Sequence, residues 1–430
     1  MKTFRMAGHE ESTKDKNVSD ELLKIWAEKD PVANFEKFLI YEEAISQEQI
    51  KEIRAEIGRY IDSEWSVAER PKIFVSNISE EINDVYSVRE TGKETWPIVV
   101  SESQLSGNPS KQLRFLDAIK QGLYQSLQKH SNLILLGQDI AEFGGVFKMT
   151  EGFVEEFGKE RIRNTPLCES AIVGTTLGLG LEGFKSVMEF QFADFVTEGF
   201  NQIVNNLAKL HYRWGQNAPV VLRMPTGAGL GSGPFHSQST EAWFAHVPGL
   251  KIVYPSNPFD AKGLMIAAIN DPNPVLFFEH KALYRSIYGN VPEDYYEVEI
   301  GKAHLVKKGD DITVITYGLG VHWALDYQKQ HPETSLHILD LRTLQPLDFN
   351  SISFAVQHTG KALILHEDSL SGGIGAELGA WISEHCFAYL DAPIVRCGSL
   401  DTPIPFNTEL EKQYLAKSRL HEAVLKLLSF

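Results

Sequence analysis

Glu169 is the first side chain in the sequence whose setting suggests proton chemistry. It comes directly after the run 165–168, TPLC, which ends a predicted strand, and it opens a stretch of small residues typical of a helix. A buried carboxylate at this position would have a raised proton affinity and could share a proton with a ring nitrogen of a ligand. Alternatively, Glu169 only complements the dipole of the helix in its first turn.

His236 is a second candidate, because it follows the glycine-rich segment 227–233, GAGLGSG. So many glycines predict a loop whose backbone must approach another group closely. Loops on α/β scaffolds often carry catalytic side chains. A lone histidine is also commonly structural or simply exposed, so the segment alone leaves both interpretations open.

Two further sequence patterns could form part of a ligand-binding site. The run 189–195, EFQFADF, alternates aromatic residues at a predicted strand end and is either core or a stacking surface for a flat ring. Gly373, Gly375 and Gly379 follow a predicted strand and open a predicted helix, as a dinucleotide fingerprint would. Their spacing departs from GxGxxG, so close packing of helix on sheet is favoured over nicotinamide binding.

Length and charge exclude several classes of protein. A chain of 430 residues predicts about three domains. The net charge of −16 disfavours nucleic acid as a partner. No apolar run reaches the roughly 18 residues of a membrane span, so we expect no membrane partner. Three widely spaced cysteines without metal spacing, and a start without an apolar signal core, predict a reducing, cytoplasmic location.

The elements that must position these residues follow an α/β pattern. Short apolar runs alternate with helical stretches over residues 110–292, and the alternation restarts over 300–430 after a turn-rich joint at 290–294. Continuous apolar strands of this kind predict largely parallel sheets covered on both faces. The strand runs are LILLGQD, KSVMEFQF, PVVLRMP, LKIVYP, PVLFFEH, ITVITYG, SLHILDL, KALILHE and PIVRCG.

Residues 1–100 form a different, highly charged region. Ser19, Asp30 and Ser46 each precede an amphipathic stretch, the arrangement of a helix N-cap. The apolar faces of these stretches are thin, so we expect a small helical appendage that packs on a neighbour. The polar stretch from about residue 72 to 109 predicts a connector.

In combination, these motifs resemble one enzyme family. TPLCE, EFQFADF, the loop ending in FHSQS, EAWFAHVPGLKIVYPSNPFDAKGL and SGGIGAELG occur in the order seen in the beta subunit of thiamine-diphosphate-dependent 2-oxo acid dehydrogenases. GGVFK, QFADF and FFEHKALYR are closer to the branched-chain type. RMAGHEES and DPVANFEKFLI, within residues 1–95, resemble the C-terminal end of the alpha subunit. We therefore expect an alpha tail fused to a whole beta part, which has a transketolase-like pyrimidine-binding domain and a transketolase C-terminal-type α/β domain.

The resemblance implies roles for four residues of the beta part. Glu169 matches the carboxylate that holds the aminopyrimidine of thiamine diphosphate. Phe195 matches the ring that packs against this aminopyrimidine, and Leu167 matches the residue that wedges the cofactor into its bent shape. His236 matches the histidine that handles protons near the substrate.

Other parts of the site are implied for the alpha side. His9 matches a histidine that contacts the diphosphate and substrate region, and Arg5 lies just upstream in the same loop. Alpha subunits hold Mg²⁺ and the diphosphate with a GDG motif, which this chain lacks. Half of the cofactor site is therefore expected on another polypeptide or on an upstream segment. Asp271 and Asn273 match positions of a monovalent-cation site, expected to bind K⁺, with a helix-capping turn as the alternative.

The predicted function is the decarboxylating component of a 2-oxo acid dehydrogenase complex. Its substrates would be branched-chain 2-oxo acids such as 2-oxoisovalerate, and its acyl product would pass to lipoyl groups. Pyruvate or acetoin is the alternative substrate, and a non-catalytic assembly module is an alternative class. The implied partners are a diphosphate-binding alpha portion, in a heterotetramer or a dimer of fused chains, and a lipoyl acyltransferase core that docks at the C-terminal Phe430.

Overall fold

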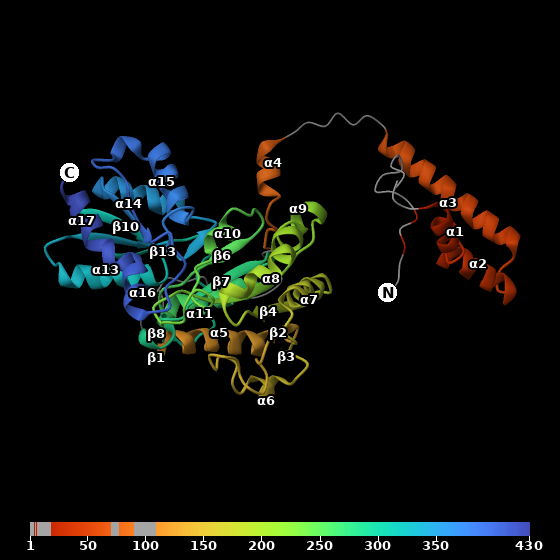
Figure 1. Cartoon of the computed structure of the whole chain (residues 1–430), viewed down its shortest axis with the longest axis horizontal. Helices are drawn as coiled ribbons and strands as arrows, with labels where there is room; N and C mark the ends of the chain where they lie inside the picture. The colour runs from red at the N-terminus through yellow and green to blue at the C-terminus, as the bar shows by residue number, and fades with distance from the viewer. Residues whose placement is uncertain (1–3, 5, 7–18, 70–76, 90–108) are drawn as a thin grey trace. The chain divides into compact units, whose positions relative to one another are not determined.

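The computed structural model describes residues 4, 6, 19–69, 77–89 and 109–430. The contacts divide the chain into two units, Met1–Asn77 and Ile78–Phe430. Figure 1 shows the helices and strands of each unit.

The described residues of the first unit form the helices α1 (Asp20–Ala27), α2 (Pro31–Tyr41) and α3 (Gln47–Ala68). The predicted caps are confirmed: Ser19 Oγ accepts from Leu22 N at 3.2 Å, and Asp30 Oδ1 accepts from Val32 N at 3.0 Å. Ser46 forms a reciprocal capping box with Gln49. None of the residues described in these helices is buried, so the capped helices carry apolar faces without a core of their own.

A seven-stranded sheet forms the first half of the second unit, with the strand order β12-β6-β7-β5-β4-β2-β3. Every neighbouring pair is parallel except β12 with β6. The strands are β2 (Leu133–Gly137), β3 (Ile162–Asn164), β4 (Lys185–Glu189), β5 (Val220–Thr226), β6 (Lys251–Val253), β7 (Val275–His280) and β12 (Thr343–Gln345). The predicted parallel sheet is confirmed.

Helices cover both faces of this sheet (Figure 1). One face packs against α5 (Phe115–Lys129) and α11 (Pro258–Asn270), and all residues of α11 are buried. The other face packs against α7 (Glu169–Leu181), α8 (Val196–Asn201) and the π-helical turn η3 (Gln202–Leu207). The shorter helices are α6 (Phe153–Phe157), α9 (Leu210–Trp214), α10 (Glu241–Ala245) and α12 (Leu283–Ser286).

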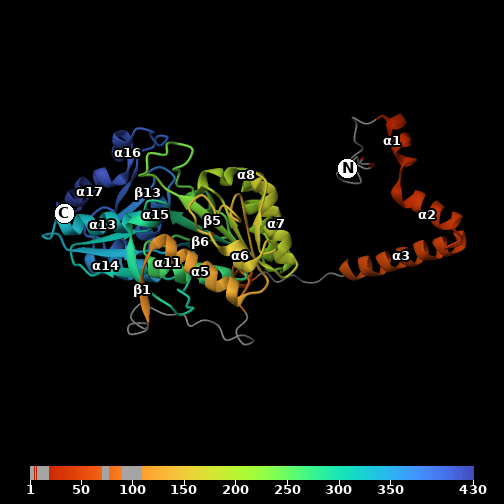
Figure 2. The same cartoon turned by 90° about the horizontal axis from the view of Figure 1, so that it is seen from below.

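A five-stranded sheet of order β14-β13-β10-β11-β9 forms the other half of the second unit (Figure 2). Its strands are β9 (His304–Lys307), β10 (Ile312–Thr316), β11 (Leu336–Asp340), β13 (Ala362–Ser369) and β14 (Val395–Ser399). The helices of this half are α13 (Leu319–Gln330), α14 (Phe349–Thr359), α15 (Ile374–His385), α16 (Thr408–Tyr414) and α17 (Leu420–Leu428). Across the described ranges of the chain, we find no helix that is both long and apolar enough to cross a membrane.

Two segments differ from the expectations. The predicted joint at 290–294 overlaps a strand, β8 (Tyr288–Pro292), which pairs antiparallel with β1 (Ser110–Arg114). The pairing joins residues far apart in sequence, so local turn signals could not reveal it.

The predicted connector also contains ordered contacts. It includes α4 (Ile78–Asn83), and Ser87 N donates to Asn273 Oδ1 at 2.8 Å. Arg89 forms two hydrogen bonds with Glu297, at 2.7 and 2.9 Å. Residues 78–89 therefore belong with the second unit rather than with the helical region predicted over 1–100.

A buried charge cluster joins the three central strands of the large sheet. Arg223 on β5 donates through Nε and Nη2 to Glu279 on β7, both at 2.7 Å, and through Nη1 to Glu189 on β4. All three side chains are buried. Because an unpaired buried charge is costly, this cluster restricts the alignment of β4, β5 and β7.

The cluster yields a stability prediction. We expect Arg223→Met to lower the free energy of unfolding by about 3 to 5 kcal/mol, because two buried carboxylates lose their shared cation. Urea unfolding of the full chain measures the change. The control is Arg163→Met, which removes an exposed pair with Glu160 and should cost less than about 1 kcal/mol. A loss no larger in Arg223→Met than in the control would contradict this role.

Candidate functional site

The candidate residues lie on loops that follow the parallel strands of the large sheet. Gln138 follows β2, Glu169 follows β3, Phe195 follows β4 and His236 comes after the loop that follows β5. The carboxyl ends of parallel strands meet at one edge of a sheet, where α/β proteins commonly bind ligands. The fold therefore brings these loops to a common edge.

Glu169 lies at the first turn of α7, and its side chain is buried. Gln138 Nε2 donates to Glu169 Oε1 at 3.1 Å. The carboxylate borders a cavity of about 390 Å³, whose lining is Gln138, Leu167, Cys168, Glu169, Ser170, Gln191, Phe195 and Glu198. Three predicted cofactor-binding residues, Leu167, Glu169 and Phe195, thus share one cavity.

His236 lies beside the aromatic residues of the neighbouring loop. Its ring is edge-on to Phe192, with centroids 4.8 Å apart, and to Phe195, with centroids 5.6 Å apart. The predicted histidine and the predicted stacking ring are therefore adjacent. The segment after His236 is held by Asp194 Oδ1, which accepts from Ser237 N at 3.2 Å and from Gln238 N at 3.1 Å.

Lys281, which follows β7, is a residue that the sequence reasoning missed. Its ammonium is buried, donates to the carbonyl of Gly227 at 2.8 Å and lies 5.6 Å from the ring centroid of Phe192. Burial lowers the pKa of Lys281 to about 8. Gln138 and Asp194 were missed as well, although Gln138 lies in the predicted strand run LILLGQD and Asp194 lies in the aromatic run.

The two residues predicted for a monovalent cation contact each other at the C-terminal end of α11. Asp271 Oδ1 accepts from Asn273 N at 2.9 Å and from Asn273 Nδ2 at 2.8 Å. Asp271 Oδ2 pairs with Lys251 at 2.6 Å. These contacts are those of a capping turn, so the structure suits the alternative interpretation, while K⁺ binding stays a prediction.

Arg5 and His9 lie outside the described residues, so their predicted contacts with the diphosphate stay predictions. Within the described part of the chain, we find no cluster of three or more His, Cys, Asp or Glu side chains suited to a metal ion. The predicted Mg²⁺ site was expected outside this chain's beta part.

The glycines at the start of α15 have a packing explanation. A Cβ on Gly375 would lie 2.5 Å from His366 Nε2, and a Cβ on Gly373 would lie 2.4 Å from the carbonyl oxygen of Ser369. Side chains at these positions would separate α15 from β13. Close packing therefore accounts for the glycines without a bound dinucleotide.

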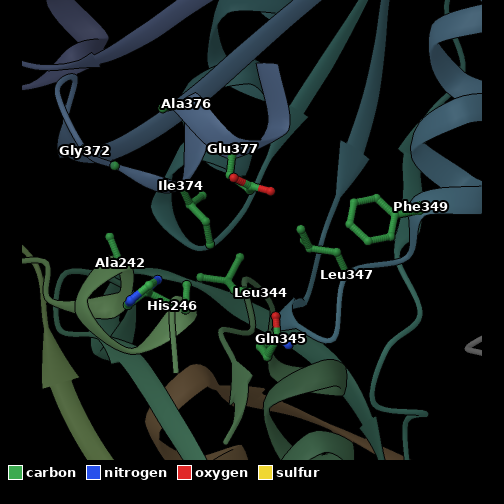
Figure 3. Close-up of a pocket in the computed structure, with 12 residues that line it drawn as sticks. Ala242, His246, Leu344, Gln345, Leu347, Phe349, Gly372, Ile374, Ala376 and Glu377 are labelled. Carbon is green, nitrogen blue, oxygen red and sulfur yellow. The ribbon is translucent and has the colours of Figure 1, made fainter. Parts of the chain in front are cut away.

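A larger cavity, of about 460 Å³, lies between α10 and the start of α15 (Figure 3). Leu344 and Ile374 point into it. Its lining includes Gly373 but none of the residues predicted to bind thiamine diphosphate, so the two cavities are separate candidates.

Family models match three successive parts of the chain. Residues 111–286 match the pyrimidine binding domain of transketolase, and residues 301–419 match the transketolase C-terminal domain. Residues 1–75 match the dehydrogenase E1 component. The predicted fold class and the predicted alpha-type origin of the first helices are both confirmed.

Individual relatives agree with these matches. The chain is 46% identical over 322 residues to the 2-oxoisovalerate dehydrogenase subunit beta of Bacillus subtilis (strain 168), covering 74% of this chain and 98% of that protein. It is 40% identical over 324 residues to the pyruvate dehydrogenase E1 component subunit beta of the same organism, covering 74% and 99%. A split gene transketolase, an inactive beta4 tetramer, shares the fold with a TM-score of 0.59 and 23% identity, covering 74% of this chain and 98% of that one.

The burial of Lys281 predicts a pH effect on stability. Its pKa of about 8 lies below the value near 10.4 of an unfolded chain. Between these values the unfolded chain binds more protons, so deprotonation at rising pH favours the folded state. We expect the free energy of unfolding of the native protein, relative to Lys281→Met, to rise by about 1 to 2 kcal/mol between about pH 7.5 and 9.5.

Urea unfolding of both proteins at the two pH values measures this shift. Lys412→Met, at an exposed lysine, is the matched control and should show no comparable shift. A pH-independent difference between native protein and Lys281→Met would contradict the burial of a charged ammonium.

Proposed function

The chain belongs to the family of 2-oxo acid dehydrogenase E1 beta subunits, and from this premise we propose that it is a catalytic decarboxylating component acting on branched-chain 2-oxo acids. Enzymes of this family depend on thiamine diphosphate. The observation that carries the proposal is the buried carboxylate of Glu169 at the edge of a cavity that it shares with Phe195 and Leu167.

The lining of this cavity suits the aminopyrimidine of the cofactor. The carboxylate of Glu169 would accept a hydrogen bond from a protonated ring nitrogen of the aminopyrimidine. This bond would favour the protonated form of the ring. Phe195 offers an aromatic ring for stacking, and Leu167, which is 80% exposed, projects from the same edge. When bound, thiamine diphosphate would supply the nucleophilic and electron-accepting chemistry that decarboxylation of a 2-oxo acid requires.

His236 is the second functional group of the proposal. Its ring lies next to Phe195, which lines the cavity, while His236 itself is not part of the lining. An imidazole can gain or lose a proton near neutral pH, which suits proton transfer at the substrate. We assign His236 to this step and Glu169 to the cofactor.

Exposed apolar side chains on the loops after the parallel strands support a covering partner. Phe143, Leu167, Leu230 and Phe235 are each more than half exposed, and all are on loops after β2, β3 or β5. Such a surface suits contact with another protein. In the proposal, a diphosphate-binding alpha portion covers this edge and holds Mg²⁺, with Arg5 and His9 contributing on the alpha side, in a heterotetramer or a dimer of fused chains.

Substrate and acceptor form the finer part of the proposal. The higher identity to the 2-oxoisovalerate enzyme, 46% against 40% for the pyruvate enzyme, favours branched-chain substrates. The acyl product would pass to a lipoyl acyltransferase core. Phe430, at the C-terminus, is 61% exposed and therefore accessible for docking to this core.

We expect Glu169→Gln to lower the turnover of decarboxylation by about 100-fold or more, because the amide cannot take part in the proton transfer. Turnover is measured in the enzyme assembled with its diphosphate-binding portion, and the melting temperature is measured in parallel. Glu182→Gln, at the other end of α7 and exposed, is the matched control with unchanged turnover. More than about a tenth of native turnover in Glu169→Gln would refute the assignment.

The substrate assignment predicts a difference in kcat/KM. In the same assembly, 2-oxoisovalerate should be used with a kcat/KM at least about 10-fold above that for pyruvate, since its larger apolar group fills more of an acyl pocket. Steady-state assays with the two acids measure the ratio. A higher kcat/KM for pyruvate would make the pyruvate alternative correct while leaving the decarboxylase assignment in place.

A further inference from the structure

The glycine loop before His236 is held by two carboxylates from the other half of the unit. Glu367, on β13, accepts from Ala228 N through Oε1 at 2.6 Å. Glu411, on α16, accepts from Gly229 N and Gly231 N through its two oxygens, each at 3.0 Å. Three backbone amides of the loop, those of Ala228, Gly229 and Gly231, thus donate to side chains of the C-terminal domain.

Both carboxylates are buried, which makes these contacts energetically significant. Glu367 is 5% exposed and Glu411 is 3% exposed. A buried carboxylate needs hydrogen bonds to compensate the loss of water, and bonds to a charged acceptor are stronger than neutral ones. Glu367 also accepts from, or shares a proton with, His280 Nε2 at 2.6 Å. Burial alone would raise the pKa of Glu367, but His280 and the amide contact bring it below its usual value.

The loop backbone lies directly against the segment that carries Glu411. A Cβ on Gly233 would lie 2.3 Å from the ring of Phe406, and a Cβ on Gly231 would lie 3.0 Å from Thr408. Both glycines have positive φ angles, of 74° and 67°. A loop with side chains at these positions could not lie so close, so the glycines permit the contact with Glu411.

At its other end, the loop is held within the pyrimidine-binding domain. Asp194 Oδ1 accepts from the amides of Ser237 and Gln238, as described above. His236 therefore lies between a fixed segment after it and a loop before it that the C-terminal domain holds. Its ring position beside Phe195 depends on both attachments.

We infer that Glu411 and Glu367 are positioning residues for His236, and that the C-terminal domain thereby sets the place of the proton-transfer group. This inference rests on the proposed function. Neither carboxylate lines the cavity, and their hydrogen bonds to the loop all come from backbone amides, so they act through the loop backbone. Without Glu411, two loop amides lose their acceptor, and the imidazole would sample positions away from the substrate.

The first arm of the test measures the amide hydrogen exchange of the loop in the full chain, a quantity that does not depend on activity. In Glu411→Ala, amide hydrogen exchange over residues 227–233 should accelerate by about 10-fold or more, because both acceptors are lost. Glu411→Gln should show a smaller acceleration, since its amide oxygen can still accept. Glu409→Ala, an exposed position on the same helix that pairs with Lys412, is the matched control with native exchange.

The second arm is a double-mutant cycle for turnover in the assembled enzyme. Glu411→Ala should lower kcat by about 10-fold or more when His236 is present, and by less than about 2-fold when His236→Ala is already in place. A residue that only stabilises the fold would give independent effects. Glu411→Gln should restore part of the lost kcat.

Each outcome decides a separate point. Native hydrogen exchange in Glu411→Ala, or additive effects on kcat, would overturn the positioning role and leave the proposed function intact. Native turnover in His236→Ala would instead overturn the catalytic assignment of His236. The role of Glu411 and Glu367 in positioning a catalytic group would then be overturned as well. Faster exchange together with a non-additive cycle supports the inference.

Discussion

The structure depends on the buried contact of Arg223 with Glu189 and Glu279 at the centre of the large sheet. Arg223 lies at the middle of β5, while Glu189 and Glu279 lie at or next to the carboxyl ends of β4 and β7, from which site loops emerge. A shift of one strand would leave a buried charge unpaired, so the cluster favours one alignment of the three strands. The loops that carry Phe195, His236 and Lys281 start from this aligned edge.

Local sequence patterns were sufficient for the main strands, whereas the residues of the cavity were predicted from the resemblance to a family. The apolar runs that became β2, β4, β5 and β7 are continuous because both faces of the sheet are covered, and this pattern is readable without a structure. Glu169, Leu167 and Phe195 were expected to bind one cofactor, and the structure places them around one cavity. Parallel strand direction is the physical reason that such distant loops meet.

Contacts between distant segments were beyond the reach of the sequence. The strand at Tyr288–Pro292 exists because it pairs with Ser110–Arg114, and no local signal encodes that partner. Glu367 and Glu411 are ordinary acidic residues by pattern, and only the fold places them against the glycine loop. Lys281 was missed for a similar reason, since its burial results from the loops packed around it.

The contacts of Ser87 and Arg89 with the pyrimidine-binding domain have a consequence for stoichiometry. They anchor the polypeptide that continues from the first unit to a defined point on the second. Two separate chains would associate according to their concentrations, whereas a tethered segment has an effective concentration set by the length of its tether. Because both parts belong to one polypeptide, each beta part carries one alpha-type tail regardless of expression level, and dilution cannot separate the two.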